Sequence, residues 1–591
     1  GDGNDSITVN GVNTYLEGQS EYGSAEVEAY GGEGDDTIKV IDKRAGVINQ
    51  YGEGYGISKV QVDGGVGKDE ITVAGALDVS ITTGADSDTI ILTSQQYRTI
   101  QEGDRIGNRI EGSISWEDWN QEKNGNGNYD DWNLETREKI EAKAISVTDF
   151  SAGAGGDILN YGDLLRNASL NYDGSNPFAG GYISLTQSGD DTLVSFDADG
   201  SAGDAAEGVV IAELKNVLAS SLIADNFNPN FPPDGSAAES EDISGTDQTD
   251  DLVGGFGDDV IQGLGGDDKI DGQAGDDTIY GGEGNDVIEG NFGNDTIYGD
   301  AGNDTITDDQ GTNIIYGGEG SDNLTGRSIT GNQTLLGGDD SDNLYATGKI
   351  IDLDGGGGSD YIYAYSYIEL EGNRVDLSDG KAILKGGEGQ DYIYSYDYDS
   401  VEIEGGSERN WLHAWGNNSK NTKEAIIQGG GDIDYIEVSN YLETKLDGGD
   451  GNDSIYDNYS GYSSIKGGLG DDYLHSNTQS NLIEGGEGSD TLISNLDPER
   501  FAWRFNGEFQ GEDLKHILKG GDGNDSITVS GSNTYQQAES NYARTEVEVY
   551  GGEGSDIIKV IDSSAGIINR NGQNHGISNV QVDGGVGKDE I

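Results

Sequence analysis

The sequence predicts a mainly β protein in which short strands alternate with glycine-rich turns, interrupted once by a small α+β module. Three observations support this prediction. From Gly254 the chain falls into consecutive nine-residue units, Gly-rich over five positions, with Asp sixth and an aliphatic residue eighth. Other stretches alternate with the period of two that is typical of a strand. Between Ser146 and Phe227 the nine-residue pattern disappears.

Each unit after Gly254 combines the residues of a turn with those of a short strand. They read GGFGDDVIQ, GLGGDDKID, GQAGDDTIY, GGEGNDVIE, GNFGNDTIY and GDAGNDTIT. Glycine permits a positive-φ turn and leaves backbone carbonyls exposed. The Asp adds a carboxylate, and carbonyl and carboxylate oxygens together are the ligands of Ca²⁺. The last three residues form a minimal strand with its aliphatic side chain inward, so the unit predicts Ca²⁺ in the turns.

These units resemble the Gly-Gly-x-Gly-x-Asp nonapeptides of the RTX family, the hemolysin-type calcium-binding repeats. The resemblance implies an elongated parallel β-roll or β-helix with Ca²⁺ in the Gly/Asp turns and two units per coil. Turns 18 residues apart would then stack, with Asp259, Asp277 and Asp295 on one edge and Asp268, Asp286 and Asp304 on the other. It also implies type I secretion from a Gram-negative bacterium, with folding outside the cell.

Residues 1–110 are predicted to form a first roll, because Asp5, Asp36 and Asp69 stand at the motif position. Residues 1–71 align without a gap with 521–591 and are identical at 49 of the 71 positions. Identity in the irregular parts indicates duplication. We therefore expect a longer chain built of tandem cassettes of ~520 residues.

Residues 111–145 read as an Asn/Asp-rich insertion. Glu122, Asn124, Asn126, Asn128 and Asp130 align with an EF-hand loop that has Gly127 at its sixth position. A calcium-binding insertion and a plain polar loop are both compatible with this segment.

Residues 146–227 read as a strand, a short helix, two strands, a further strand and a final Leu-rich helix. The TDF…GDILN, LVSFDADG and Leu-rich segments resemble the target module often found near the C-terminus of type I secretion substrates. Here that module lies inside the chain. Residues 228–250, with three of the five prolines, are predicted to be a linker.

Residues 251–591 are predicted to form a second roll of regular and then lengthened coils. One turn column is expected to persist while the opposite turn degenerates, giving about 14 inter-coil steps, or roughly 67 Å at ~4.8 Å each. Asn410 replaces an Asp and is a candidate weak site. Beyond Asp304 the predicted metal-binding aspartates are Asp322, Asp342, Asp360, Asp391, Asp434, Asp453, Asp472, Asp490, Asp525, Asp556 and Asp589.

Alternating tyrosines mark the lengthened coils. We expect Tyr361, Tyr363, Tyr365 and Tyr367 to share one face of a strand, near Tyr392, Tyr394, Tyr396 and Tyr398. Stacked tyrosine ladders would stabilise a parallel coil. The alternative is an adhesive or glycan-binding aromatic strip.

The charge favours a protein whose carboxylates are neutralised by bound cations. Asp and Glu number 111 against 33 Lys and Arg, a formal net charge of -78, which disfavours nucleic acid as a partner and would favour disorder unless cations neutralise it. No apolar run is long enough for membrane insertion. HExxH and GxSxG are absent, so we predict no enzyme.

The function that we predict is that of a secreted, calcium-dependent structural protein of a Gram-negative cell surface. It would form a filament, a sheath or an S-layer-like array with itself as partner. The alternative is the extender region of a giant RTX adhesin, with cell-surface glycans or lipopolysaccharide as partners. The non-catalytic part of an RTX exoprotein is the third choice.

Overall fold

The computed structural model describes residues 3–10, 25–41, 57–94, 143–166, 172, 175–202, 208–328, 331–370, 373–377, 379–417, 422–496, 514–531, 545–562 and 577–591. The chain divides into two compact units, which are considered separately. Unit 1 comprises Gly1–Ser240 and Gly255–Gly257, and unit 2 comprises Glu241–Gly254 and Asp258–Ile591. The predicted fold class, an elongated parallel β-coil, is confirmed in the described residues.

Unit 1 contains two sheets that are built mainly of parallel strands. The six-stranded sheet contains, in order, β1 (Ser6–Asn10), β3 (Thr37–Ile41), β5 (Glu70–Ala74), β7 (Thr89–Ile91), β9 (Ile158–Asn160) and β13 (Phe227–Asn228). The seven-stranded sheet contains β10 (Ile183–Ser188), β11 (Asp191–Phe196), β12 (Val209–Leu214), β8 (Ile145–Val147), β6 (Asp78–Ala85), β4 (Ile57–Val66) and β2 (Ala25–Glu33). Because β8 pairs with β6 and β9 with β7, the middle segment extends the sheets of the first roll.

The end of that middle segment differs from the sequence prediction. The short helix is present as α3 (Gly162–Arg166), but the predicted final Leu-rich helix is wrong. Its residues form two 3₁₀ turns, η3 (Ala219–Ser221) and η4 (Ala224–Asn226), whereas the strand predicted before it is present as β12. A further 3₁₀ turn, η2 (Gly200–Ala202), lies earlier. Asn226 explains why no helix continues here. Its side chain donates to the carbonyls of Gly153 (3.1 Å) and Asp157 (2.9 Å) and so holds the chain against another loop.

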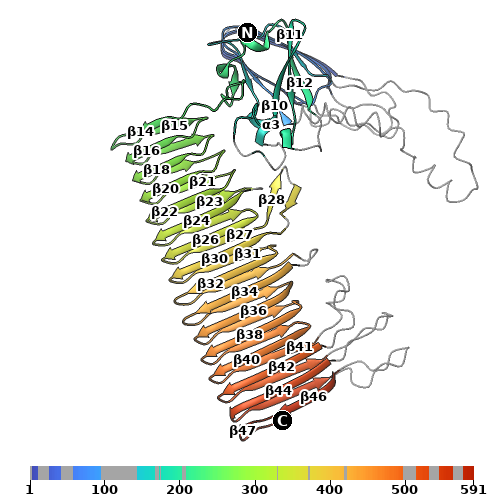
Figure 1. The fold of residues 1–591 in the computed structure, drawn as a ribbon, viewed down its shortest axis with the longest axis vertical. Helices are drawn as coiled ribbons and strands as arrows, with labels where there is room; N and C mark the ends of the chain where they lie inside the picture. Colours follow the sequence, from blue (N-terminus) through green and yellow to red (C-terminus); the bar gives the residue numbers. More distant parts are fainter. Residues whose placement is uncertain are drawn as a thin grey trace, which may run out of the picture. The chain divides into compact units, whose positions relative to one another are not determined.

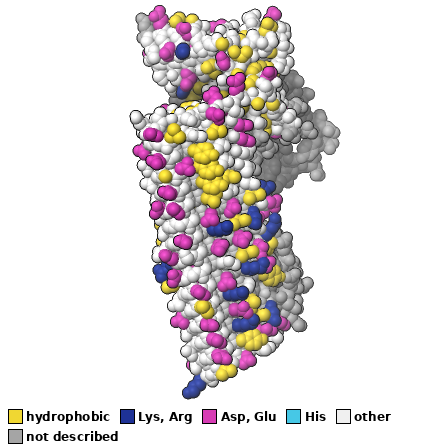
Figure 2. All heavy atoms as spheres, turned by 60° about the vertical axis from the view of Figure 1, so that its left-hand side comes forward, with side chains coloured by type: hydrophobic (Ala, Val, Ile, Leu, Met, Phe, Trp, Pro, Cys, Tyr) yellow, Lys and Arg dark blue, Asp and Glu magenta, His cyan; other side chains and the backbone are white. Residues whose placement is uncertain are grey.

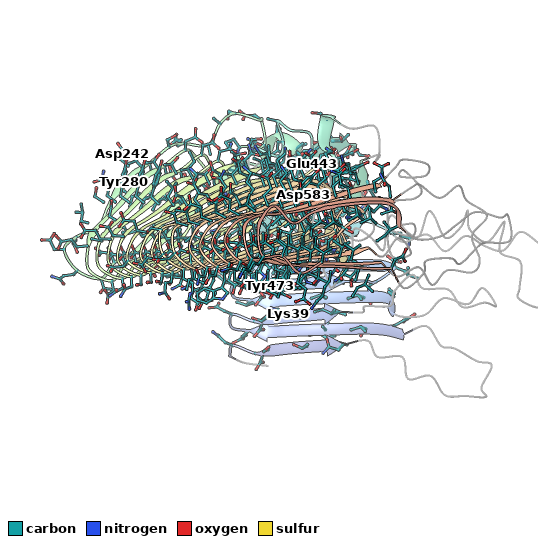
Figure 3. All side chains as sticks on the ribbon, turned by 90° about the horizontal axis from the view of Figure 1, so that it is seen from below. Lys39, Asp242, Tyr280, Glu443, Tyr473 and Asp583 are labelled. Atoms are coloured by element: carbon teal, nitrogen blue, oxygen red, sulfur yellow. The ribbon has the colours of Figure 1, made fainter. Side chains whose placement is uncertain are left out.

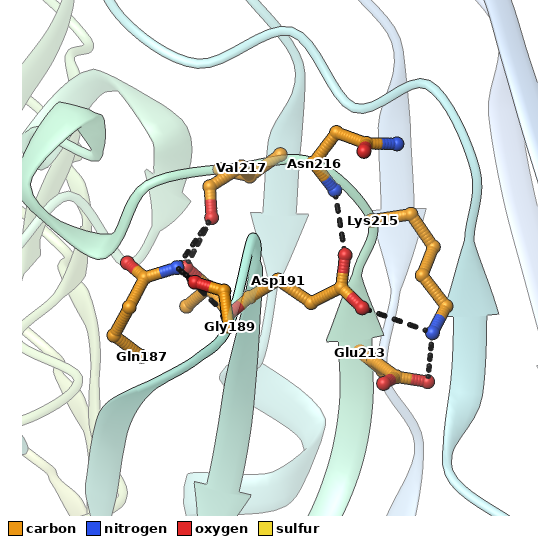
Figure 4. Close-up of polar contacts among 8 residues, drawn as sticks. Gln187, Gly189, Asp191, Glu213, Lys215, Asn216 and Val217 are labelled. Carbon is orange, nitrogen blue, oxygen red and sulfur yellow. Dashed lines mark hydrogen bonds and ion pairs between the residues drawn. The ribbon is translucent and has the colours of Figure 1, made fainter.

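Polar contacts fix the turn after β12 against the antiparallel β10–β11 hairpin (Figure 4). Lys215 Nζ lies 3.2 Å from Asp191 and 2.7 Å from Glu213. The backbone N–H of Asn216 donates to Asp191 at 2.8 Å, and this bond lowers the pKa of the Asp191 carboxyl. Gln187 Nε2 donates to the Val217 carbonyl at 3.3 Å. These hydrogen bonds pair backbone N–H and C=O groups that a helix would otherwise have paired.

Unit 2 is a coil of two long parallel sheets (Figure 1). The 17-stranded sheet contains β14 (Asp242–Ser244), β16 (Val260–Gly265), β18 (Thr278–Glu283), β20 (Thr296–Ala301), β22 (Asn313–Glu319), β24 (Asn332–Asp339), β26 (Ile350–Gly357), β30 (Lys381–Glu388), β32 (Ser400–Gly406), β34 (Thr422–Gly430), β36 (Tyr441–Asp450), β38 (Tyr462–Leu469), β40 (Ser480–Glu487), β42 (Leu514–Asp522), β44 (Thr545–Gly554), β46 (Ile577–Asp583) and β47 (Val586–Gly587). β14 lies within the segment predicted as a linker.

The 15-stranded sheet completes each coil. It contains β15 (Asp251–Gly255), β17 (Lys269–Gln273), β19 (Val287–Glu289), β21 (Thr305–Asp308), β23 (Asn323–Arg327), β25 (Asn343–Thr347), β27 (Tyr361–Tyr365), β31 (Tyr392–Tyr396), β33 (Trp411–Trp415), β35 (Tyr435–Ser439), β37 (Ser454–Asn458), β39 (Tyr473–Asn477), β41 (Thr491–Leu496), β43 (Ser526–Gly531) and β45 (Ile557–Asp562). A separate hairpin joins β28 (Tyr367–Leu370) to β29 (Asn373–Asp376).

The core of unit 2 is a double column of aliphatic side chains between the sheets. Along the 15-stranded sheet, Ile436, Ile455 and Leu474 occupy successive coils and are all fully buried. Figure 3 shows the coil end-on, with Tyr280 and Glu443 on the outside of one sheet and Tyr473 on the outside of the other. Each coil is too thin to bury its aliphatic side chains alone, so the stacking of neighbouring coils creates the core.

Aromatic rings stack between coils as the sequence indicated. Tyr361 and Tyr392 lie 4.7 Å apart at 3°, and Tyr392 and Trp411 lie 4.5 Å apart at 2°. Tyr367 and Tyr398 depart from the expected face. Tyr367 belongs to β28, and Tyr398 is fully buried with its hydroxyl donating to the carbonyls of Gly348 (3.1 Å) and Tyr365 (2.9 Å). β31 ends at Tyr396 and Asp397 has a positive φ of 65°, which breaks the strand alternation.

Candidate calcium sites in the coil turns

The motif aspartates of unit 2 form a hydrogen-bonded ladder along one edge of the coil. The backbone N–H of Asp453 donates to Oδ1 of Asp472, and that of Asp472 donates to Oδ1 of Asp490, both at 2.8 Å. A step of 35 residues keeps the same bond, from Asp490 N–H to Asp525 Oδ1 at 2.9 Å. The rungs of this long ladder are Asp250, Asp268, Asp286, Asp304, Asp322, Asp342, Asp360, Asp391, Asn410, Asp434, Asp453, Asp472, Asp490, Asp525, Asp556 and Asp589.

The opposite edge of unit 2 has a short ladder, and unit 1 has a third. The short ladder runs from Glu241 through Asp259, Asp277, Asp295 and Asn313. The N-terminal ladder of unit 1 runs through Asp5, Asp36, Asp69, Asp88 and Asp157. The two edges of unit 2 therefore divide the aspartates as the 18-residue spacing predicts, and past Asn313 the long ladder alone continues.

The second oxygen, Oδ2, has no hydrogen-bond partner in most rungs, although it is buried. An unpartnered buried carboxylate oxygen is costly, so its recurrence at one position of successive turns calls for a common ligand. The rungs with such an oxygen are Asp36, Asp69, Asp88, Asp268, Asp277, Asp286, Asp295, Asp304, Asp322, Asp342, Asp360, Asp391, Asp434, Asp453, Asp472, Asp490, Asp525 and Asp556.

Most of these oxygens face a glycine cradle that also holds a carbonyl oxygen. A Cβ built on Gly281 would lie 2.5 Å from Asp286 Oδ2 and 2.7 Å from the Gly299 carbonyl oxygen. A Cβ on Gly272 would lie 2.6 Å from Asp277 Oδ2 and 3.0 Å from the Gly290 carbonyl oxygen. Carboxylate and carbonyl oxygens thus converge where the sequence excludes a side chain. This oxygen-only donor set fits Ca²⁺.

The backbone of the turn also needs glycine. Gly282 and Gly284 have φ of +111° and +138°, and a side chain on either would collide with a carbonyl of the preceding coil. Leu264 occupies the same turn position as Gly282, one coil earlier, and still has a φ of +75°. The coil therefore imposes the left-handed conformation even where the residue disfavours it.

When no cation is bound, burial disfavours the ionised form of these carboxylates. It raises the pKa of Asp472 and of Asp490 to about 7, and that of Asp277 to about 9. Hydrogen bonds from the backbone of the preceding rung lower each pKa, but the loss of hydration outweighs them. A divalent cation beside the carboxylate would restore its ionised form at neutral pH.

Asparagine rungs keep the ladder but have no free oxygen. Asn410 Oδ1 accepts the N–H of Asp391 at 3.0 Å, while its Nδ2 donates to the Glu408 carbonyl at 3.0 Å. Asn313 does the same, with Nδ2 donating to the Gln310 carbonyl at 2.7 Å. An amide N–H₂ cannot bind a cation, which is the physical reason to expect a weak or absent site at Asn410.

Sequence reasoning missed the rungs Asp88, Asp157 and Asp250. Their turns lack the full glycine pattern, but each Asp is followed by an aliphatic residue one or two positions later. The terminal rungs differ chemically from the inner ones. Oδ2 of Asp250 accepts from the Thr246 N–H at 2.6 Å, and Oδ2 of Asp157 accepts from the Ser151 N–H at 2.9 Å.

Side chains alone do not enclose a metal in the described part of the chain, where no three His, Cys, Asp or Glu gather at one point. A cation in these turns would need backbone carbonyls, as the glycine cradles provide. The predicted EF-hand-like residues Glu122, Asn124, Asn126, Asn128 and Asp130 lie outside the described residues.

Comparison with known proteins identifies the repeats. Residues 244–279, 271–306, 298–328, 445–458 and 464–497 match the family model of the RTX calcium-binding nonapeptide repeat (4 copies). The matched segments include turns of both ladders of unit 2. No curated protein matches the chain. Within the described residues, the helices are all too short or too polar to span a bilayer.

Proposed function

We propose, from the premise that the chain carries calcium-binding RTX repeats, that it is an extracellular structural protein of a Gram-negative bacterial surface. RTX repeats are typical of secreted bacterial proteins. Calcium would act as the folding switch, since its binding free energy becomes folding free energy when the unfolded chain has no preformed site. The role is mechanical and involves no catalysis: coils held by calcium form a stiff element of a filament, a sheath or an S-layer-like array.

The ladders are the observation that supports this role. In unit 2 both sheets run through the whole stack of coils, and the long ladder joins each coil to the next through one carboxylate. Without cations, one buried charge per coil would repel the next. With cations the same repeat becomes a continuous rigid element, as expected of a protein that transmits or resists force.

Lateral assembly needs a surface on which a chain of net charge -78 can meet a copy of itself. The outer face of the 17-stranded sheet has such a surface, because lysines and acids alternate across its strands. Lys466 lies between Asp447 and Glu484 in register, and Glu484 is followed by Lys519. Figure 2 shows one face of the molecule, where basic and acidic side chains lie interspersed below an apolar patch. In the same sheet Tyr298 stacks between Tyr280 and Tyr316 at 4.9 and 4.8 Å.

The charge row is self-complementary. A two-fold axis between β38 and β40 would place Lys466 of one copy opposite Glu484 of the other, and Asp447 opposite Lys519. These side chains are half exposed, and the present ion pairs of Lys519 with Glu484 (2.6 Å) and of Lys466 with Asp447 (3.9 Å) leave them within reach of a second copy. Opposite charges across an interface favour one register over others.

Sedimentation and negative-stain electron microscopy of the calcium-loaded chain test this proposal. We expect ordered dimers, filaments or sheets that Lys466→Glu with Lys519→Glu abolishes. The control, Lys269→Glu with Lys559→Glu, makes the same charge change on the 15-stranded sheet and should assemble normally. A calcium-loaded chain that stays monomeric at all concentrations would instead favour the passive extender of a giant adhesin.

A further inference from the structure

The short ladder ends at a pair of buried carboxylates. Glycines recur every 18 residues before its rungs, at Gly254, Gly272 and Gly290, so the next position is residue 308. That residue is Asp308, the last residue of β21, and it is fully buried on the inner face of the strand. The earlier coils have glycine at this position, so Asp308 places a carboxylate in the interior where they have only a hydrogen atom.

Asp308 shares its cradle with Asp295. A Cβ built on Gly290 would lie 2.5 Å from Asp308 Oδ2 and 2.8 Å from Asp295 Oδ2, so the two oxygens converge on one point. Asp295 Oδ2 and both oxygens of Asp308 are buried without a well-formed hydrogen bond. At the preceding turn, Gly272 faces only one carboxylate oxygen, from Asp277, and one carbonyl oxygen, from Gly290. Asp308 thus adds a second carboxylate at a position that otherwise has a carbonyl.

Two facing carboxylates require a positive partner. Side by side and out of water, they cannot both be ionised unless a cation or a proton lies between them. The donors are all hard oxygens, as Ca²⁺ prefers, and affinity in calcium sites rises with the number of charged ligands. The ladder has no carboxylate beyond this turn, because its next rung is Asn313, whose Nδ2 faces a carbonyl.

We propose that Asp295 and Asp308 form a two-carboxylate Ca²⁺ site that closes the short ladder and binds more tightly than the one-carboxylate turns before it. The inference rests on the calcium reading of the ladders. Its dianionic ligand set neutralises a divalent cation fully, whereas a turn with one carboxylate leaves a residual positive charge. The site would hold the coil at the point where the second turn column ends.

The test is stepwise chelation of the full calcium-loaded chain, with bound Ca²⁺ counted by native mass spectrometry at each chelator concentration. Asp308→Gly restores the residue found at Gly272 and Gly290, so this variant is expected to fold. The wild type should retain one Ca²⁺ at chelator concentrations at least tenfold higher than those that strip the other turns. Asp308→Gly should lose this last ion, and Asp277→Asn, a matched change one coil earlier, should keep it.

Asp308→Asn separates a shared cation from a shared proton. If the pair holds Ca²⁺, this variant loses the last ion as Asp308→Gly does. If the pair shares a proton, Asp308→Asn and wild type lose their last Ca²⁺ at the same chelator concentration, and the inference is overturned. Equal retention in wild type and Asp308→Gly also overturns it, while the remaining bound ions leave the general calcium role intact. A wild-type chain with no bound Ca²⁺ would instead refute the proposed function itself.

Discussion

Replacing inner rungs by asparagine should stabilise the calcium-free coil and destabilise the calcium-loaded one. Asp453, Asp472 and Asp490 are consecutive rungs, and burial raises their pKa to about 6, 7 and 7. The ordinary pKa is 3.8, so the folded state binds the proton more tightly than the unfolded state does. Stability from these groups is therefore fully present below pH 4 and is lost as pH rises through 6 to 7.

The pKa shifts set the size of this effect on the free energy of folding. At pH 8 each ionised rung costs the calcium-free fold about 3 to 4 kcal/mol, and three rungs together cost about 12 kcal/mol as an upper bound. That equals the whole stability of an ordinary domain. Asparagine removes this cost and keeps the ladder, as Asn410 shows with its Oδ1 accepting from Asp391. With calcium bound, the same change removes a ligand at each turn.

The assay is a pH titration of metal-free protein followed by circular dichroism. Wild type should lose β signal between pH 5 and 8, and the triple variant Asp453→Asn, Asp472→Asn, Asp490→Asn should lose it at higher pH. In saturating calcium the triple variant should unfold at lower urea than wild type. Asp432→Asn, Asp450→Asn, Asp471→Asn removes three exposed charges nearby and should change neither result. A triple rung variant that is destabilised with and without calcium would refute the reasoning.

Three further predictions follow from other parts of unit 2. Chelation with EGTA at pH 8 should abolish most of the β signal in circular dichroism, and full retention would contradict the calcium role of the turns. Leu264→Gly should raise the free energy of unfolding in urea by about 1 kcal/mol, because Leu264 has a φ of +75°. Leu264→Ala keeps the strained backbone and should give no such gain. Ile455→Ala should cost about 3 kcal/mol in calcium, since Ile455 is fully buried between two coils, whereas the change Ser454→Ala on the outer face should be nearly neutral.

Short-range patterns made the coil predictable. A glycine pair followed by Asp and one aliphatic residue specifies turn, rung and core together, so rungs such as Asp286 could be placed from spacing alone. Asp88 escaped because Asp86 stands at a glycine position of its turn, with a positive φ of 85°. Asp250 escaped because Thr246 and Gln248 stand where the later turns of the repeat have glycine. Tyr398 was misplaced because a single positive φ at Asp397 reverses the inward and outward faces, and nothing in the alternating tyrosines indicates that reversal.

Long-range pairing could not be predicted. β8 lies beside β6 although 59 residues separate the end of one from the start of the other, so the middle segment continues the first roll. The Leu-rich stretch after Lys215 has helical composition, yet the tertiary bonds of Asn226 override that local preference. Asp308 also needed the structure, because only stacking brings it to Gly290 and Asp295.

The long ladder has a direction. Each rung's N–H donates to a side-chain oxygen of the coil that follows it in the chain, as Asp472 does to Asp490. A coil therefore becomes complete only when its C-terminal neighbour is in place, whereas that neighbour already presents its acceptor oxygen. Ordering that starts near Asp589 would spread towards the N-terminus rung by rung, each finished coil serving as the template for the one before it.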